Sequence, residues 1–131
     1  MTNTNKFRKS ERLTSQKEIQ SLFTDGRSFH SFPFRIVWKF SDTTNSQPAR
    51  VVISVPKRKF KRAVDRNLIR RRIKEGYRVN KQILYEYLNQ AEVNLVFMLM
   101  YTHSEIMDSN ELEDKISKLL VRFKQEVKVN T

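Results

Sequence analysis

Residues 57–81 are KRKFKRAVDRNLIRRRIKEGYRVNK, and this stretch decides both the fold and the charge distribution of the chain. It contains twelve of the 26 Lys and Arg residues against two acids, Asp65 and Glu75, and so carries a net +10 of the formal +12 of the protein. A compact fold that concentrates like charge in this way repels itself, and a phosphate backbone is the partner that most often neutralises such a site. The stretch therefore predicts a nucleic-acid interface.

From about Ala63 the stretch has the periodicity of a helix. At about 100° per residue, one side collects the positions expected in the core: Ile69, Ile73, Gly76, Asn80, Ile83 and Leu84. Another arc of about 100° collects Asn67, Arg70, Arg71, Lys74, Arg78 and Lys81, with Arg66 at its edge. A solvated face usually interleaves both signs of charge, so this arc is expected to bind RNA or DNA. Gly76 allows a kink or break, since a mid-helix glycine costs about 1 kcal/mol relative to alanine.

Upstream of the basic stretch, the pattern predicts a helix and two strands. Ser15 and Glu18 have capping-box spacing for a first helix that ends at Gly26. Residues 32–40 alternate as a half-buried strand, with one face formed by Phe34, Ile36 and Trp38 and the other by Arg35, Val37 and Lys39. Residues 50–55 form a second strand. A polar linker, SDTTNSQP at 41–48, is expected to join the two strands as an antiparallel hairpin.

Downstream, one more strand and one more helix are expected. Residues 93–101 are almost continuously apolar, which is typical of a central strand buried on both faces. A final helix starts near Asp108 and has an apolar face formed by Leu112, Ile116, Leu119, Leu120, Phe123 and Val127. The order α, β, β, α, β, α predicts a single α+β domain over residues 1–131, with a small sheet packed by helices.

The composition excludes several classes of protein. Without cysteine there is no disulfide scaffold, thiolate zinc site or cysteine nucleophile. The amino terminus has no apolar segment typical of an export signal, and the longest apolar run is too short to span a membrane. We therefore expect a cytoplasmic protein with no membrane partner. No protein oligomer is predicted.

A resemblance to a known family is carried by residues 63–75, AVDRNLIRRRIKE. They resemble the signature helix of the bacterial ribonuclease P protein subunit, A-V-x-R-N-R-I-K-R-x-I-R-E. Leu68 departs from it, standing where the family has an arginine, with Arg70 or Arg72 as substitutes. The resemblance extends to Arg12-Leu13 with the segment KEIQSLF before Gly26, and to the strand VVISVPK at 51–57.

The resemblance implies an accessory protein of a ribozyme that removes the 5′ leader from precursor tRNA. In that family the RNA supplies the active site, so no catalytic residue is expected on the protein. Mg²⁺ is expected only through the bound RNA, with no metal site on the protein. The partners implied are the catalytic RNA and precursor tRNA. A left-handed βαβ crossover is also implied, and residues 1–12 are expected to be flexible without RNA.

Two groups of site residues follow from the basic stretch and from the resemblance. The catalytic RNA is expected to be bound by Lys57, Arg58, Lys59, Lys61, Arg62, Arg66, Asn67, Arg70, Arg71, Lys74 and Arg78. The single-stranded leader is expected in a cleft between the first helix and the sheet. By position, that cleft would be formed by Arg12, Ile19, Phe23, Phe34, Val37 and Trp38. The residues alone do not decide which face of the first strand lines it.

Two alternatives belong to other classes of function. A ribosomal or other structural RNA-binding protein would share the basic charge and the small α+β fold. A protein-only ribonuclease could use His30 and His103, the only imidazoles, for acid and base catalysis. Neither histidine lies in a recognisable motif, and ordinary polar loop residues are the simpler interpretation of both.

Overall fold

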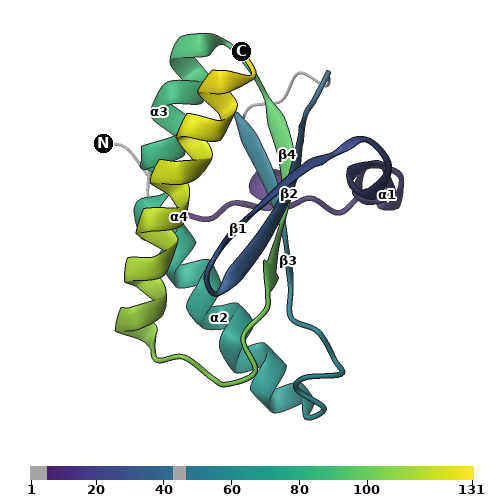
Figure 1. Ribbon diagram of the computed structural model, residues 1–131, viewed down its shortest axis with the longest axis vertical. Helices are drawn as coiled ribbons and strands as arrows, with labels where there is room; N and C mark the ends of the chain where they lie inside the picture. The colour runs from purple at the N-terminus through teal and green to yellow at the C-terminus, as the bar shows by residue number, and fades with distance from the viewer. Residues whose placement is uncertain (1–5, 43–46) are drawn as a thin grey trace.

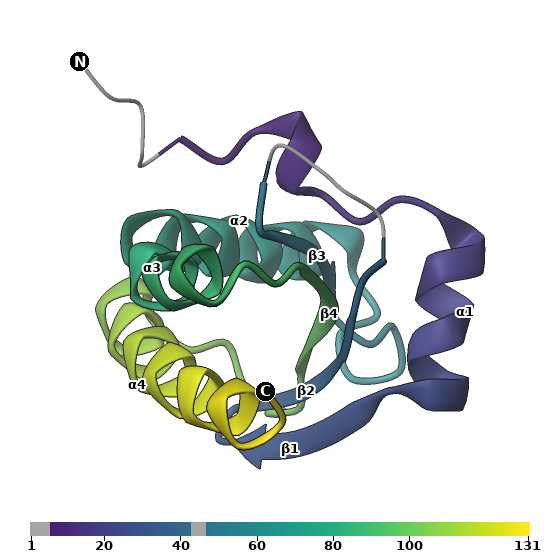
Figure 2. The same cartoon turned by 90° about the horizontal axis from the view of Figure 1, so that it is seen from above.

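The computed structural model describes residues 6–42 and 47–131, and its sheet and helices form three layers (Figure 1). The elements in chain order are the 3₁₀ helix η1 (Lys9–Glu11), α1 (Gln16–Asp25), β1 (Arg27–Ser31), β2 (Phe34–Phe40), β3 (Ala49–Ser54), α2 (Ala63–Asn80), α3 (Gln82–Ala91), β4 (Leu95–Tyr101) and α4 (Ser109–Val129). Seen from above, α2, α3 and α4 cover one face of the sheet and α1 lies on the other (Figure 2). The predicted α+β fold, a small sheet packed by helices, is confirmed.

The predicted hairpin between residues 32–40 and 50–55, which form β2 and β3, is wrong. The sheet order is β1-β2-β4-β3, so β4 lies between β2 and β3. β4 pairs antiparallel with β2 and parallel with β3. The reason lies in the composition of β4: its apolar run is buried on both faces, which only a central position in the sheet provides. Residues 43–46 of the linker lie outside the described residues.

The hairpin of this fold is formed instead by β1 and β2, which meet through a cis Phe32-Pro33 bond. β1 was not predicted from the sequence, because RSFHS buries only Phe29 and has no apolar alternation. Its register on β2 places Phe29 opposite Ile36.

The crossover from β3 to β4 runs through α2 and α3 (Figure 1 and Figure 2). Seen from the side of these helices with both strands pointing upward, β4 lies to the left of β3. The crossover is therefore left-handed, as the family resemblance implied. This hand is uncommon, since about 98% of such connections are right-handed.

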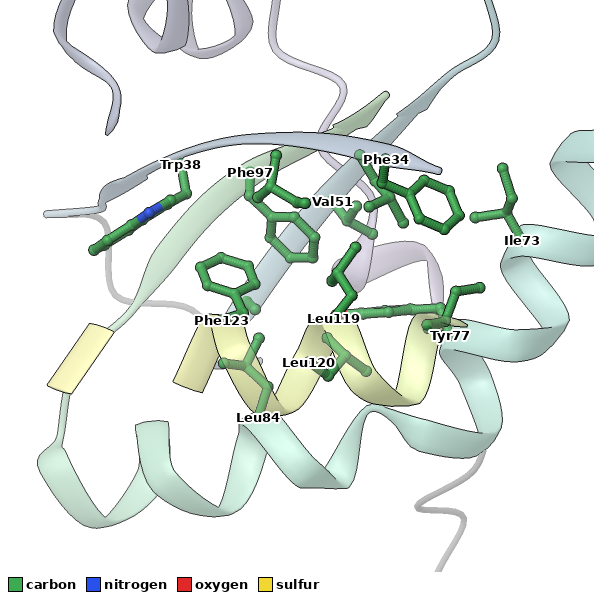
Figure 3. Close-up of a cluster of buried hydrophobic side chains, with 14 of the residues drawn as sticks. Phe34, Trp38, Val51, Ile73, Tyr77, Leu84, Phe97, Leu119, Leu120 and Phe123 are labelled. Atoms are coloured by element: carbon green, nitrogen blue, oxygen red, sulfur yellow. The ribbon is translucent and has the colours of Figure 1, made fainter. Parts of the chain in front are cut away.

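The main core lies between the sheet and the three helices (Figure 3). Phe123 of α4 is at its centre, with ring centroids 5.0 Å from Phe97 and 5.7 Å from Trp38. The six apolar residues predicted for the last helix are all buried there. A smaller cluster on the opposite face seats α1 on the sheet and contains Leu13, Leu22, Val37, Val96 and Met98.

The predicted helix starts are confirmed by their caps. The Ser15 hydroxyl accepts a hydrogen bond from Glu18 N at 3.3 Å, and α1 ends at Gly26. The Asp108 carboxylate accepts from Asn110 N and Glu111 N at the start of α4. These side chains satisfy backbone donors that have no partner within the helix.

The helix does not break at Gly76, the position where the sequence allowed a kink or break. Residues 63–80 form one helix through Gly76, and the break comes at Lys81, between α2 and α3. Gly76 lets α4 approach closely, because a Cβ there would lie 2.7 Å from Ile116 Cδ1.

The described part of the amino-terminal segment contacts β3. Residues 1–5 lie outside the described residues, whereas 6–12 pack against the body of the protein. Arg12 forms a parallel bridge with Val51, and Leu13 N donates to Val51 O at 2.9 Å. Glu11 is fully buried. None of the helices in the described part of the chain is long and apolar enough to cross a membrane.

Candidate RNA interface

The basic face predicted for the helix is present on α2. Arg71 and Asn67 are exposed, and Arg70 and Lys74 are half-buried at its flank. Arg70 Nη1 donates to Asn67 Oδ1 at 3.2 Å, which links two residues of the face one turn apart. Core positions Ile69 and Ile73 are fully buried on the opposite side, so packing fixes the direction in which the cations point.

Arg72 is not part of this face. Its guanidinium donates to Met107 O at 2.9 Å and ties α2 to the segment before α4. Of the two substitutes considered for the family arginine at Leu68, Arg70 is therefore the one that lies with the basic face.

A basic loop, residues 57–62, leads into α2. Lys57, Arg58, Lys59, Lys61 and Arg62 are all exposed. The loop is anchored by Phe60, which is buried against Tyr101 with ring centroids 6.0 Å apart. Phe60 was not singled out from the sequence, although a single aromatic residue between three cations and a basic pair is the available signal. Lys59 Nζ also donates to Thr102 O.

Arg66 joins the loop to the helix. Its Nη1 donates to Phe60 O at 2.7 Å and to Lys61 O at 3.0 Å. The structure thus gives this residue of the signature a positioning contact, since it holds the backbone of the loop against the first turn of α2. No side chain caps that turn at Arg62.

One cation of the face is paired within the helix. Arg78 Nη2 lies 2.6 Å from Glu75 Oε1, and Arg78 Nε donates to the other carboxylate oxygen at 3.0 Å. This hydrogen bonding holds the pKa of Glu75 below its ordinary value and raises that of Arg78. Both side chains are exposed, so solvent screens the pair. The pair therefore weakens the positive field of the basic face only near Arg78.

Two adjoining grooves lie between α2 and the amino-terminal segment. The first, of about 200 Å³, has an apolar floor from β3 and is lined at its edges by Arg12, Arg70 and Lys74. The second, of about 430 Å³, is called the N-terminal groove here. It is lined by Lys6, Phe7, Arg8, Arg12, Arg71, Lys74, Glu75 and Arg78. Phe7, Arg12 and Lys74 line both grooves.

The predicted leader cleft needs one correction. Phe34 and Trp38 cannot line it, because they are 0% and 1% exposed in the main core, on the face opposite α1. Figure 3 shows both side chains pointing into that core. Turning either one out would forfeit roughly 2–3 kcal/mol of burial.

Of the other predicted cleft residues, Ile19, Phe23 and Val37 belong to α1 and to the face of the sheet that it covers, whereas Arg12 lines the grooves beside α2. Val37 is 3% exposed beneath α1, and Ile19 packs against the same cluster. Phe23, one turn after Ile19, is 59% exposed. Ile19 and Val37 thus share the cluster between α1 and the sheet, and Phe23 is exposed one turn further along α1.

Further residues of the α1 face were not singled out from the sequence. Arg35 is exposed and stands opposite Met100, while Val52 of β3 stands beside Met98. The alternation that separates Arg35 and Val37 from Phe34 was the available signal.

The two histidines occupy different settings. His30 lies in strand β1 opposite Arg35, and not in a loop as expected. His103 follows β4 and packs edge-on against Phe32, with ring centroids 5.0 Å apart. Within residues 6–42 and 47–131, no three His, Asp or Glu side chains are grouped so that they could hold a metal ion.

Comparisons with known proteins agree with this geometry. The family model described as Ribonuclease P matches residues 7–124. A ribonuclease P protein component from Porphyromonas gingivalis is 32% identical over 115 residues, covering 88% of this chain and 84% of that protein. One from a Geobacter species is 28% identical over 125 residues, covering 95% and 97%.

Solved structures show the same fold. The RNase P protein of Staphylococcus aureus superposes with a TM-score of 0.70 at 20% identity, covering 88% of this chain and 97% of that chain. The RNase P protein of Thermotoga maritima gives 0.68 at 21% identity, covering 86% and 96%. The match of the family model over nearly the whole described chain, together with these relatives, shows that the chain belongs to the family of the ribonuclease P protein component.

Proposed function

We propose that this chain is the protein subunit of ribonuclease P and assists removal of the 5′ leader from precursor tRNA. In this proposal the exposed face of α2 and the basic loop bind the catalytic RNA. The α1 face of the sheet binds the single-stranded leader. The observation that carries the proposal is the net +10 of residues 57–81, in which every cation except Arg72 and Lys81 lies in the basic loop or on the basic face of α2.

The chemistry of the described side chains supports a role in binding. The cations of α2 and the loop suit phosphate oxygens, and a protein that neutralises about six phosphates loses of order 10³ in affinity between about 50 and 200 mM salt. Phe23 of α1 and Arg35 of β2 are both exposed, and an aromatic ring can stack on an unpaired base for about 1–3 kcal/mol.

Mg²⁺ enters this proposal through the RNA. Three of the acidic side chains are engaged with cations: Glu75 with Arg78, Glu18 with Arg50 and Glu11 with Lys81. Mg²⁺ prefers oxygen ligands that include phosphates. The protein would lower the Mg²⁺ requirement by neutralising part of the RNA charge, and the phosphodiester hydrolysis would be carried by the RNA. We expect removal of the leader to take place in the cytoplasm.

The test is to mix the purified protein with a bacterial ribonuclease P RNA and measure leader cleavage at low Mg²⁺, with each component alone as control. The proposal predicts efficient cleavage only by the mixture. Cleavage by the protein alone would favour the protein-only nuclease and His30 with His103. Tight RNA binding without any effect on cleavage would favour the structural RNA-binding protein.

A further inference from the structure

The N-terminal groove has one wall that the signature helix does not supply. Lys6, Arg8 and Arg12 come from the segment before α1, and they face Arg71 and Lys74 of α2 across the groove. Six of the eight lining residues are Lys or Arg, and the single acid, Glu75, is already hydrogen-bonded to Arg78. A groove so strongly positive is complementary to a polyanion.

Phe7 anchors this wall to the helix. Its ring packs edge-on against Tyr77 of α2, with centroids 5.8 Å apart. The Arg12 guanidinium lies 5.6 Å from the centre of the same ring. An aromatic ring fixed in this way holds the adjoining cations close to α2.

A buried polar cluster also fixes the segment before α1. Lys81 Nζ lies 2.5 Å from Glu11 Oε1 and also donates to Lys6 O. The other Glu11 oxygen accepts from Arg8 N at 2.5 Å, and the Tyr85 hydroxyl donates to Oε1 at 2.9 Å. Lys81 is 3% exposed and Glu11 is 0% exposed, so the pair is inside the protein.

The Glu11–Lys81 pair contributes more to the specificity of the fold than to its stability. Burying two charges costs about as much as their attraction returns, so a buried ion pair adds little net stability, and its better-attested role is to specify one arrangement of the chain. Here the ion pair specifies the position of Lys6 and Arg8. Lys81 donates a hydrogen bond to the backbone oxygen of Lys6, and Glu11 accepts one from the backbone nitrogen of Arg8.

We propose that Lys6, Arg8 and Arg12 bind phosphates of the catalytic RNA in the N-terminal groove, and that Glu11 and Lys81 are positioning residues for this second wall. The inference rests on the proposed function, because Arg71 and Lys74 are shared with the face that binds that RNA. It extends the interface from one helix face to a groove with cations on both sides.

The test compares Arg8→Ala with Lys9→Ala. Each variant removes one positive charge from the same segment, but Lys9 is not among the residues that line the groove. Equilibrium binding to ribonuclease P RNA is measured between about 50 and 200 mM salt. We expect Arg8→Ala to lower the slope of log affinity against log salt by about 1 and to weaken binding about threefold to tenfold. Lys9→Ala should change affinity less than about twofold.

The positioning role is tested by combining substitutions. Lys81→Met should weaken RNA binding although Lys81 does not line the groove, and adding Arg8→Ala to it should cause little further loss, because Lys81 acts through that wall. Additive losses would overturn the positioning role. If Lys81→Met does not fold, the comparison of Arg8 with Lys9 still decides whether the wall binds RNA.

Arg71→Ala separates failure of this inference from failure of the proposed function. If Arg71→Ala weakens binding while Arg8→Ala behaves like Lys9→Ala, only the second wall is refuted. If Arg71→Ala also has no effect, the proposed function fails with it. If Arg8→Ala weakens binding of precursor tRNA and leaves binding of the catalytic RNA unchanged, the assigned occupant is wrong.

Discussion

Arg50 of β3 donates two hydrogen bonds to the Glu18 carboxylate of α1, at 2.8 and 2.7 Å, across 32 residues of sequence. The contact joins α1 to the edge strand of the sheet. It therefore sets the position of the helix that carries Ile19 and Phe23. The hydrogen bond from Arg50 is the main reason that the pKa of Glu18 is lowered, against the effect of its partial burial.

Stability should fall in acid through this contact. Because the pKa of Glu18 in the folded protein lies below its ordinary 4.5, the contribution is complete above that pH and is lost as pH falls through the folded value. We expect Glu18→Gln to lower the free energy of unfolding by about 1 kcal/mol at neutral pH, and the difference from the wild type to shrink as pH falls through the lowered pKa of Glu18. Urea unfolding at several pH values measures this. The control is Asp25→Asn. It removes the more exposed ion pair of Asp25 with Lys39, whose charged atoms lie 4.0 Å apart, and should change the free energy of unfolding little.

The leader contact can be tested with two phenylalanines of almost equal exposure. Phe23 of α1 is 59% exposed and Phe32 of the β1-β2 hairpin is 57% exposed. We expect Phe23→Ala to weaken binding of precursor tRNA by about 1–3 kcal/mol, because a stacked base is lost, and to leave mature tRNA unaffected. Phe32→Ala should affect neither RNA. Equal weakening of precursor and mature tRNA by Phe23→Ala would refute the leader site.

Substitution of Arg66 should act through the shape of the basic loop. Arg66→Ala removes hydrogen bonds to Phe60 O and Lys61 O, so proteolysis within residues 57–62 should become faster and RNA affinity should fall. Arg66→Lys should restore the charge but only part of the affinity, since an ammonium group lacks the planar fork of a guanidinium. Full recovery with Lys would mean that Arg66 contributes charge alone.

Gly76 should be intolerant of alanine despite its position inside a helix. Alanine favours the helix by about 1 kcal/mol, but its Cβ would lie 2.7 Å from Ile116 Cδ1, which is fully buried. Overpacking of this kind costs about 1–3 kcal/mol, so Gly76→Ala should be destabilising in thermal unfolding. Ile116→Val removes the obstructing methyl group, and the double variant should be more stable than the sum of the single effects. Simple additivity would show that the helices separate instead.

Much of the fold was predictable because local signals and burial agree. The apolar face of α4, the caps at Ser15 and Asp108, and the basic face of α2 all follow from helical spacing. Strand pairing did not follow. A run such as residues 34–40 shows which side chains share a face, but the position of β4 between β2 and β3 depends on contacts between distant residues.

Part of the candidate site was likewise predictable from the sequence and part was not. Cations of α2 were predictable because charge is visible in the sequence, whereas Phe34 and Trp38 were misassigned because alternation does not say which face meets α1. The wall formed by Lys6 and Arg8 had no signal at all. It depends on Glu11 and Lys81, which are 70 residues apart and meet only in the folded chain.

The most direct test of the central claim is the Mg²⁺ dependence of precursor tRNA cleavage by the reconstituted enzyme. Arg71→Ala/Lys74→Ala removes two cations from α2, and Lys118→Ala/Lys128→Ala removes two from exposed positions of α4. If α2 binds the catalytic RNA, the first variant shifts the Mg²⁺ midpoint towards that of the RNA alone and the second leaves it at the wild-type value. The same midpoint for both variants would contradict the assignment of α2.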